Sequence, residues 1–325
     1  MTERGVQGDT LADTLMLEDV LEGLALPQKE ISPKYFYDTR GSKLFEEITR
    51  LEEYYPTRTE LALLRRWTPE WVKRWRPAAL VELGAGSARK SRVVLDAMTR
   101  AASGNLYVPV DVSGEFLHDT ARRLREEYRD LRVEPEIADI TLPLSLSVPL
   151  PEPAWFALLG STLGNFDAAH AARLLRRIAG HLRPRDRFLV GVDLRPGPGK
   201  SVARLEAAYN DAHGVTAAFN RNVLNVLNRA LGADFRPEAF LHRAFYHEAE
   251  GRIEMHLVAC EPMEVRFASG HVVPIRAGET LRTEISCKYD APSIEALFAE
   301  AGLRVSQWVE DEEGLFALIL AEGEA

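Results

Sequence analysis

Short apolar runs alternate with helical segments from residue 79 to residue 195, and this alternation limits the possible folds more than any other feature. The apolar runs are AALVELGAG, LYVPVDVS, LRVEPEIADI, WFALLGSTLGN and DRFLVGVDL. Strands that alternate with helices predict an α/β fold, in which helices cover both faces of a parallel sheet. Strands buried on both faces are apolar throughout, as these runs nearly are.

The alternation stops at Pro196-Gly197-Pro198. Residues 199–285 hold a long helical segment and then strand-like pieces, which indicates an inserted α+β region. After residue 285 the pattern of alternating helices and strands resumes, with the predicted helix SIEALFAEAGL and the predicted strands RVSQWVED and LFALILAE. Only a short EEG turn separates these strands, so we expect them to pair in antiparallel fashion.

We therefore predict two domains, one from residues 61–196 and 286–325, the other from residues 1–60 and 197–285. Residues 1–30 have helical periodicity. Pro56 should interrupt any helix in the segment that follows, because proline restricts the residue before it. Thr57 or Thr59 would then cap the next helix.

Charge and composition argue against several classes of protein. The net charge is -9, which is not the electrostatic footprint of a nucleic-acid binder. The two cysteines form no CxxC pair, and the histidines have no ligand spacing, so we expect no metal site. No apolar run reaches the ~20 residues of a membrane span, and the N-terminus lacks a secretory pattern. We expect a cytoplasmic monomer that binds a small molecule.

The segment VELGAGS ends the first predicted strand and contains Gly84 and Gly86. Glycines let the backbone turn sharply and approach a ligand, and such sheets bind ligands at the carboxyl ends of their strands. Arg89 occupies the third glycine position of a GxGxxG dinucleotide fingerprint, so that fingerprint is incomplete. The turn suits S-adenosylmethionine, which has no phosphate. A tight turn that only packs a helix on a strand is the alternative.

Acidic residues end the next two predicted strands. Asp111 could accept hydrogen bonds from both ribose hydroxyls of a nucleoside, or cap the helix that follows. Asp139 could face an adenine amino group, and a capping role fits it equally well. Lys90 could pair with a carboxylate of the cofactor or lie on a solvated helix face. The predicted antiparallel pair at the chain's end is typical of methyltransferase sheets that bind S-adenosylmethionine, whereas dehydrogenases tend to add parallel strands.

Several blocks together resemble the histidine N-alpha-methyltransferases of the ergothioneine pathway. They are SPKYFYDTRGSKLFEEITRLEEYYPTRTE, VELGAGSARKSRVVLDAM, LLGSTLGNF, DAHGVTAAFNRNVLNVLN, GRIEMHL and TEISCKY. The resemblance runs from about residue 32 to residue 321. It implies a Rossmann-like S-adenosylmethionine methyltransferase sheet with an added α+β substrate-binding domain.

The resemblance also implies roles for individual residues. Tyr54, Asn165 and Tyr209 would hold the α-carboxylate and amine of the substrate, and Tyr37 would lie near the reacting amine. The residues implied at the imidazole are Glu284 and Ser286, which would hydrogen-bond it, and Met255, which would line its pocket. The residues implied at the cofactor are Gly84, Gly86, Lys90, Asp111, Asp139, Ile140, Gly160 and Ser161. Ile140 departs from the aromatic residue that is typical there.

The expected activity is the methylation of the L-histidine α-amine by S-adenosylmethionine, with S-adenosylhomocysteine as the other product. Three transfers would give the trimethyl betaine hercynine. The alternatives are an N-methyltransferase for another amino acid such as tryptophan, and a binding protein on a degraded methyltransferase fold. Glu284 and Met255 argue against the former, and the glycine turn with Asp111 argues against the latter.

Overall fold

The computed structural model describes residues 4–324, and these divide into two compact units. The first, here the α8 unit, comprises the chain up to Tyr54 with Glu206–His247 and Ile253–Ile285. The second, here the sheet unit, comprises Tyr55–Leu205, Glu248–Arg252 and the chain from Ser286. The first boundary between the units, at residues 54/55, lies six residues before the predicted boundary at 60/61. The second boundary lies at residues 205/206, whereas the prediction placed it at 196/197.

The sheet unit is built on an eight-stranded sheet in the order β13-β14-β7-β6-β2-β3-β4, with β5 also paired to β3. Its strands are β2 (Ala79–Leu83), β3 (Leu106–Asp111), β4 (Arg132–Val133), β5 (Glu136–Ile137), β6 (Ala154–Leu158), β7 (Arg187–Asp193), β13 (Leu303–Glu310) and β14 (Phe316–Gly323). Neighbouring strands from β4 to β7 are parallel, whereas β14 is antiparallel to both β7 and β13. The predicted parallel sheet and its terminal antiparallel pair are confirmed.

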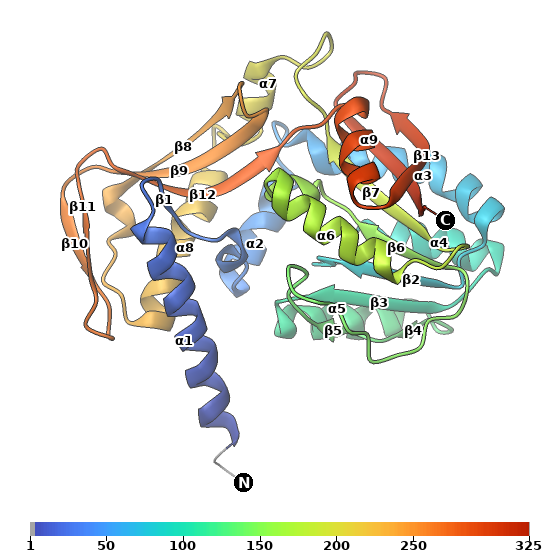
Figure 1. Ribbon diagram of the computed structural model, residues 1–325, viewed down its shortest axis with the longest axis horizontal. Helices are drawn as coiled ribbons and strands as arrows, with labels where there is room; N and C mark the ends of the chain where they lie inside the picture. The colour runs from blue at the N-terminus through green and yellow to red at the C-terminus, as the bar shows by residue number, and fades with distance from the viewer. Residues whose placement is uncertain (1–3, 325) are drawn as a thin grey trace. The chain divides into compact units, whose positions relative to one another are not determined.

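Helices cover both faces of this sheet (Figure 1). They are α3 (Tyr55–Trp75), α4 (Ser91–Ala101), α5 (Gly114–Glu127), α6 (Ala168–His181) and α9 (Ala291–Glu300). The sheet unit also contains the short helix η2 (Thr162–Asn165), and α7 (Val202–Ala207) begins in this unit and crosses its limit at Leu205. In Figure 1, α6 and α9 lie side by side in front of the sheet, and α3 and α4 lie together behind it. All residues of β2 and β6 are buried, as expected for strands covered on both sides.

Two local features differ from the sequence prediction because of proline. Helix α3 begins at Tyr55, so Pro56 lies in its first turn, where a helix tolerates a residue without an N–H. Thr59 is therefore not a cap; its hydroxyl donates to the carbonyl of Tyr55 at 3.0 Å. Pro135 divides the third predicted strand into β4 and β5, because it has no N–H to donate to the ladder.

The α8 unit has a four-stranded sheet in the order β1-β12-β9-β8 and a separate antiparallel pair, β10 with β11. Its strands are β1 (Lys29–Glu30), β8 (Phe240–His247), β9 (Arg252–Ala259), β10 (Met263–Arg266), β11 (Val272–Ile275) and β12 (Thr280–Cys287). Its helices are α1 (Arg4–Ala25), η1 (Pro33–Phe36), α2 (Thr39–Ile48), α8 (Val215–Leu231) and η3 (Pro237–Ala239). Helix α8 contacts α1, α2, η1 and β8, so it forms the centre of this unit.

Within residues 4–324, none of the helices combines the length and apolar character that a membrane crossing needs.

Candidate functional site

The turn after β2 is held in the shape that its glycines allow. Gly84 and Gly86 have φ angles of +72° and +50°, in the left-handed region that favours glycine. The amides of Gly84 and Ala85 both donate to the carbonyl of Val110, at 2.8 and 3.1 Å. A Cβ added to Gly86 would meet no atom within 4 Å, so open space lies beside this backbone. The turn therefore offers the close backbone approach that a ligand needs.

Asp111, the last residue of β3, is fixed beside this turn. One carboxylate oxygen accepts the Gly86 amide at 3.0 Å, and the other accepts the Ser113 amide at 3.0 Å. A carboxylate has about four lone-pair sites, so these two bonds leave acceptor capacity for hydroxyl groups. The structure thus brings together Gly84, Gly86 and Asp111, three of the residues predicted at the cofactor.

Asp139 lies two residues beyond the end of β5 rather than at a strand end. Its carboxylate accepts the amide and the hydroxyl of Thr141, at 2.8 and 2.6 Å, so it stabilises a local turn. Ile140 is half-buried and packs against the apolar core of the sheet. Asp139 therefore caps no helix, because the described residues between β5 and β6 form none.

A buried carboxylate that sequence reasoning missed lies beside Lys90. Glu60 on α3 is fully buried, and its carboxylate lies 2.7 Å from the Lys90 ammonium. Both oxygens of Glu60 also accept the Gly160 amide, each at 2.9 Å. Gly160 has a φ angle of +86°, a conformation that favours glycine, and a Cβ added to it would lie 2.8 Å from the Lys90 Nζ. The one signal for Glu60 in the sequence was a charged residue beside the apolar run of α3.

Glu82, the penultimate residue of β2, is a second buried carboxylate. It accepts hydrogen bonds from the hydroxyls of Ser91 and Tyr107. Burial raises the pKa of this carboxyl to about 7, because desolvation outweighs these hydrogen bonds and the charge of Lys90. Glu82 is therefore a group of the glycine turn whose charge changes near neutral pH.

A third buried carboxylate, Asp193 at the end of β7, gathers two lysines and a tyrosine. The Lys200 and Lys288 ammonium groups lie 2.5 and 2.8 Å from its oxygens, and the Tyr55 hydroxyl donates to it at 2.9 Å. Lys288 also donates to the Ser286 hydroxyl at 2.8 Å. Ser286, predicted to bind substrate, is therefore connected through Lys288 to a buried ionic cluster.

Electrostatics in this cluster favour the ionised carboxylate. Burial alone would raise the pKa of Asp193, but the ammonium groups of Lys288 and Lys200 outweigh it and hold that pKa below its ordinary value. Burial lowers the pKa of Lys200 to about 8, although Asp193 opposes the change. The Asp193 amide also donates to the Ser161 hydroxyl at 3.0 Å, which fixes another predicted site residue.

The loop of residues 160–165 carries Ser161 and Asn165 and packs closely on residues 286 and 287. Ser161 has a φ angle of +57°, and Asn165 ends η2. A Cβ added to Gly164 would lie 2.7 Å from the Cys287 carbonyl oxygen and 3.5 Å from the Ser286 Oγ. The absence of a side chain at residue 164 therefore lets this loop approach Ser286.

In the α8 unit the predicted tyrosines belong to one row of aromatic rings. The Tyr54 and Tyr209 ring centres lie 6.2 Å apart, and Phe45 lies 6.3 Å from Tyr54 and 5.8 Å from Tyr37. The structure thus joins Tyr37, Tyr54 and Tyr209 through Phe45, a residue for which we predicted no role. Met255 on β9 is buried, and Glu284 on β12 is half-buried.

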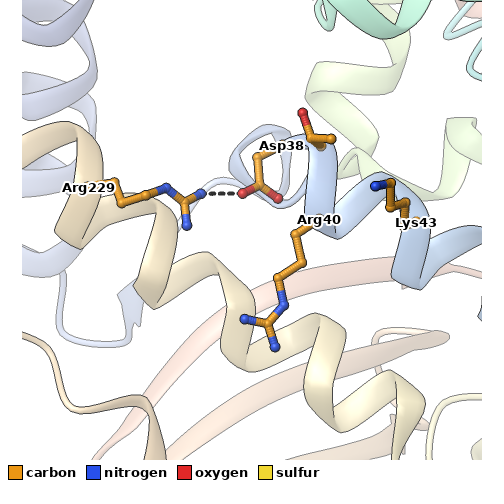
Figure 2. A pocket seen from close by; sticks show the side chains of 5 residues that line it. Asp38, Arg40, Lys43 and Arg229 are labelled. Carbon is orange, nitrogen blue, oxygen red and sulfur yellow. Dashed lines mark hydrogen bonds and ion pairs between the residues drawn. The ribbon is translucent and has the colours of Figure 1, made fainter.

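Tyr37 is held in place through the residue that follows it. Asp38 caps α2 by accepting the Gly41 amide at 2.6 Å, and it also accepts the Asn222 side chain at 2.8 Å and pairs with Arg229. Figure 2 shows that pair at a surface pocket lined by Asp38, Thr39, Arg40, Lys43 and Arg229. None of the predicted site residues lines this pocket. Asp38 therefore anchors the start of α2 to α8.

Among residues 4–324, no group of three His, Cys, Asp or Glu side chains could hold a metal ion.

Comparison with known proteins gives one consistent family. Residues 16–323 match the family described as histidine-specific methyltransferase, SAM-dependent. A histidine N-alpha-methyltransferase of Mycobacterium tuberculosis is 42% identical over 97% of both chains. The ergothioneine biosynthesis protein 1 of Neurospora crassa is 31% identical over 88% of this chain and 32% of its own length. A 4-dimethylallyltryptophan N-methyltransferase of Claviceps purpurea is 24% identical over 88% of both chains.

Proposed function

The chain belongs to the family of histidine-specific, S-adenosylmethionine-dependent methyltransferases, and from this premise we propose that it methylates the α-amino nitrogen of L-histidine. The observation that carries the proposal is the match of almost the whole chain to a histidine N-alpha-methyltransferase at 42% identity. We propose three successive transfers, which give the trimethyl betaine hercynine and three molecules of S-adenosylhomocysteine. We further propose that the enzyme acts in the cytoplasm as a monomer.

The residues around the glycine turn fit S-adenosylmethionine. The sulfonium supplies an electrophilic methyl group, so the protein must bind and orient rather than activate covalently. Asp111, fixed by two backbone amides, suits the ribose hydroxyls, and the open backbone at Gly86 suits the amino-acid part. Lys90, held by Glu60 near Gly160, provides a cation for the carboxylate. Asp139 and Ile140 are proposed at the adenine, and Ser161 near both ligands.

We propose that the substrate is held at both of its ends. Tyr54, Tyr209 and Asn165 would bind the α-carboxylate and the amine. The amine must be neutral to accept a methyl group, and an α-amino group has a pKa near ~8. The Tyr37 hydroxyl would accept a hydrogen bond from the amine, directly or through one water, and so relay the released proton to solvent. Holding the carboxylate and the imidazole while leaving the amine free to rotate permits repeated methylation.

Recognition of the imidazole is the proposed source of specificity. The Glu284 carboxylate would accept the imidazole N–H, with Ser286 and Met255 completing the pocket. A substrate that lacks the matching donor would lose this charge-assisted hydrogen bond and would bind more weakly. Tryptophan is larger and places its single N–H elsewhere, so it is the poorer candidate.

Mass spectrometry of the products tests this proposal. L-histidine and L-tryptophan are each incubated with the purified protein and S-adenosylmethionine. We expect a gain of three methyl groups on histidine and none on tryptophan. Glu284→Ala should lower kcat/KM for histidine by about a hundredfold, because a charge-assisted hydrogen bond to the imidazole is lost. Glu264→Ala, an exposed glutamate on β10, should leave it unchanged. Methylation of tryptophan but not histidine would contradict the proposal.

A further inference from the structure

A buried amide in the α8 unit connects three of the proposed substrate residues. Asn220 on α8 is fully buried. Its Nδ2 lies 2.9 Å from the His242 Nδ1 and 3.2 Å from the His256 carbonyl oxygen. Its Oδ1 accepts the Thr283 hydroxyl at 2.6 Å. The other ring nitrogen of His242, Nε2, lies 2.8 Å from the carbonyl oxygen of Tyr209.

These contacts assign every donor and acceptor in the cluster. A backbone carbonyl only accepts, so the Asn220 atom that faces the His256 carbonyl must be the nitrogen. That nitrogen donates to the His242 Nδ1, which must therefore carry no hydrogen. The Nε2 then carries the hydrogen and donates to the Tyr209 carbonyl. His242 is thus neutral, with one defined tautomer.

The cluster reaches the proposed pocket at three points. His242 holds the backbone of Tyr209, and the Thr283 hydroxyl lies 3.1 Å from the Met255 carbonyl. Thr283 directly precedes Glu284 on β12. The cluster therefore supports residues proposed for both ends of the substrate. Tyr209 is proposed at the carboxylate end, and Met255 and Glu284 are proposed at the imidazole end.

Protonation of His242 is incompatible with this arrangement. A proton on Nδ1 would face the Asn220 N–H groups. Rotating the amide would not relieve the conflict, because Oδ1 would then face the His256 carbonyl. Burial lowers the pKa of His242, which favours the neutral ring. The charged groups that act on it are Asp211 before α8 and Arg221 on α8. The neighbouring strand β9 carries Glu254 and His256, whose side chains bond to each other.

We propose that Asn220 and His242 are positioning residues of the histidine pocket: together they hold the Tyr209 main chain and the Thr283 end of β12 in their binding positions, and they do so only while His242 is neutral. The proposal rests on the proposed function, because it assigns Tyr209, Met255 and Glu284 to the bound histidine. It gives the enzyme a built-in loss of histidine affinity at acid pH that does not involve the cofactor.

The tautomer is tested by NMR of protein labelled with 15N at histidine. The His242 signals, assigned by their absence in His242→Gln, should show a protonated Nε2 and an unprotonated Nδ1 at neutral pH. Asn220→Asp should raise the pH at which His242 titrates, since a carboxylate would then face Nδ1. A protonated Nδ1 in the unaltered protein would overturn the proposal.

Two substitutions of one residue separate positioning from packing. His242→Gln keeps an N–H donor for Tyr209 and cannot titrate, so the KM for histidine should stay within about twofold of the unaltered protein at pH 8. His242→Leu keeps apolar bulk without the donor, and the KM should rise roughly tenfold, the usual worth of one buried hydrogen bond. As the pH falls through the lowered pKa of His242, the histidine affinity of the unaltered protein should fall relative to that of His242→Gln.

Cofactor binding and a matched histidine serve as controls. The Kd for S-adenosylhomocysteine should be the same in all variants, and His271→Gln, at an exposed histidine of the same unit, should behave as the unaltered protein. Equal KM values for His242→Gln and His242→Leu would overturn the inference. If the unaltered protein neither binds nor methylates histidine, the proposed function fails instead, while the NMR result still reports on the cluster.

Discussion

At the scale of single residues, the pair of Glu60 and Lys90 separates stability from binding. Lys90→Met would remove the cation that pairs with the fully buried Glu60 carboxylate, which should lower the unfolding free energy by about 3–5 kcal/mol. Adding Glu60→Gln should recover most of that loss, because glutamine still accepts the Gly160 amide without a charge. Urea unfolding of the single and double variants measures both effects.

The double variant should recover stability but not affinity for S-adenosylhomocysteine. If Lys90 holds the cofactor's carboxylate, both variants should bind S-adenosylhomocysteine roughly tenfold more weakly, as expected for one charge-assisted hydrogen bond. Calorimetric titration measures this affinity. Lys73→Met, at an exposed lysine of α3, is the control and should change neither quantity. A double variant that regains full affinity would show that Lys90 acts only as the partner of Glu60.

The sequence predicts a residue's surroundings well where a local rule applies. Gly84, Gly86 and Asp111 lie at strand ends, and their mutual contacts follow from where parallel strands end. Glu60 and Asn220 have no such rule, because their partners lie far away along the chain: 100 residues separate Glu60 from Gly160, and 63 separate Asn220 from Thr283. Charged and polar side chains are mostly exposed to solvent. The fold instead buries Glu60 and Asn220 and supplies hydrogen-bond partners for both.

At the scale of elements, hydrophobic pattern identified the strands, and proline decided where the prediction failed. The runs that became β2, β3, β6 and β7 are continuous and apolar, so their pattern was decisive. The effects of Pro56 and Pro135 were harder to predict, because proline lies in the first turn of a helix in one case and divides a strand in the other. Which outcome occurs depends on whether a missing N–H leaves a hydrogen bond unmade.

The loop around η2 provides a test at this scale. Gly164→Ala would place a methyl group 2.7 Å from the Cys287 carbonyl oxygen, a backbone atom that cannot rotate away. The loop carrying Asn165 must then move away from Ser286. We expect the KM for histidine to rise about tenfold or more, since small displacements of binding groups are costly, while the Kd for S-adenosylhomocysteine changes little. Steady-state kinetics and calorimetry measure the two.

Gly180→Ala is the matched control for that substitution. Gly180 lies in α6, and an added Cβ there meets nothing within 4 Å. Alanine should raise the unfolding free energy by about 0.4–1 kcal/mol, through helix propensity and reduced freedom of the unfolded chain, without altering the KM. Equal kinetics for the two glycine variants would show that close contact at residue 164 does not position the site.

At the scale of the whole molecule, two buried carboxylates give stability opposite pH dependences. The Asp193 pKa is held below its ordinary 3.8, so its contribution is present above that pH and is lost as the pH falls through the lowered value. The Glu82 pKa is raised from 4.5 to about 7, so the folded protein binds more protons than the unfolded chain between those values. Its contribution is full below pH 4.5 and is lost as the pH rises.

Glu82→Gln isolates that second dependence. The shift of the Glu82 pKa from 4.5 to about 7 corresponds to roughly 3 kcal/mol. Glutamine cannot ionise, so the unfolding free energy of the variant relative to the unaltered protein should rise by about that amount between pH 4.5 and pH 8. Urea unfolding across this range measures the difference between the unfolding free energies of the two proteins. Both proteins contain the same histidines, so the contributions of the histidines cancel in this difference. Glu300→Gln, at an exposed glutamate of α9, is the control substitution. A flat difference for Glu82→Gln would mean that Glu82 is ionised in the folded protein throughout this range, stabilised by Ser91, Tyr107 and Lys90 more strongly than burial opposes it.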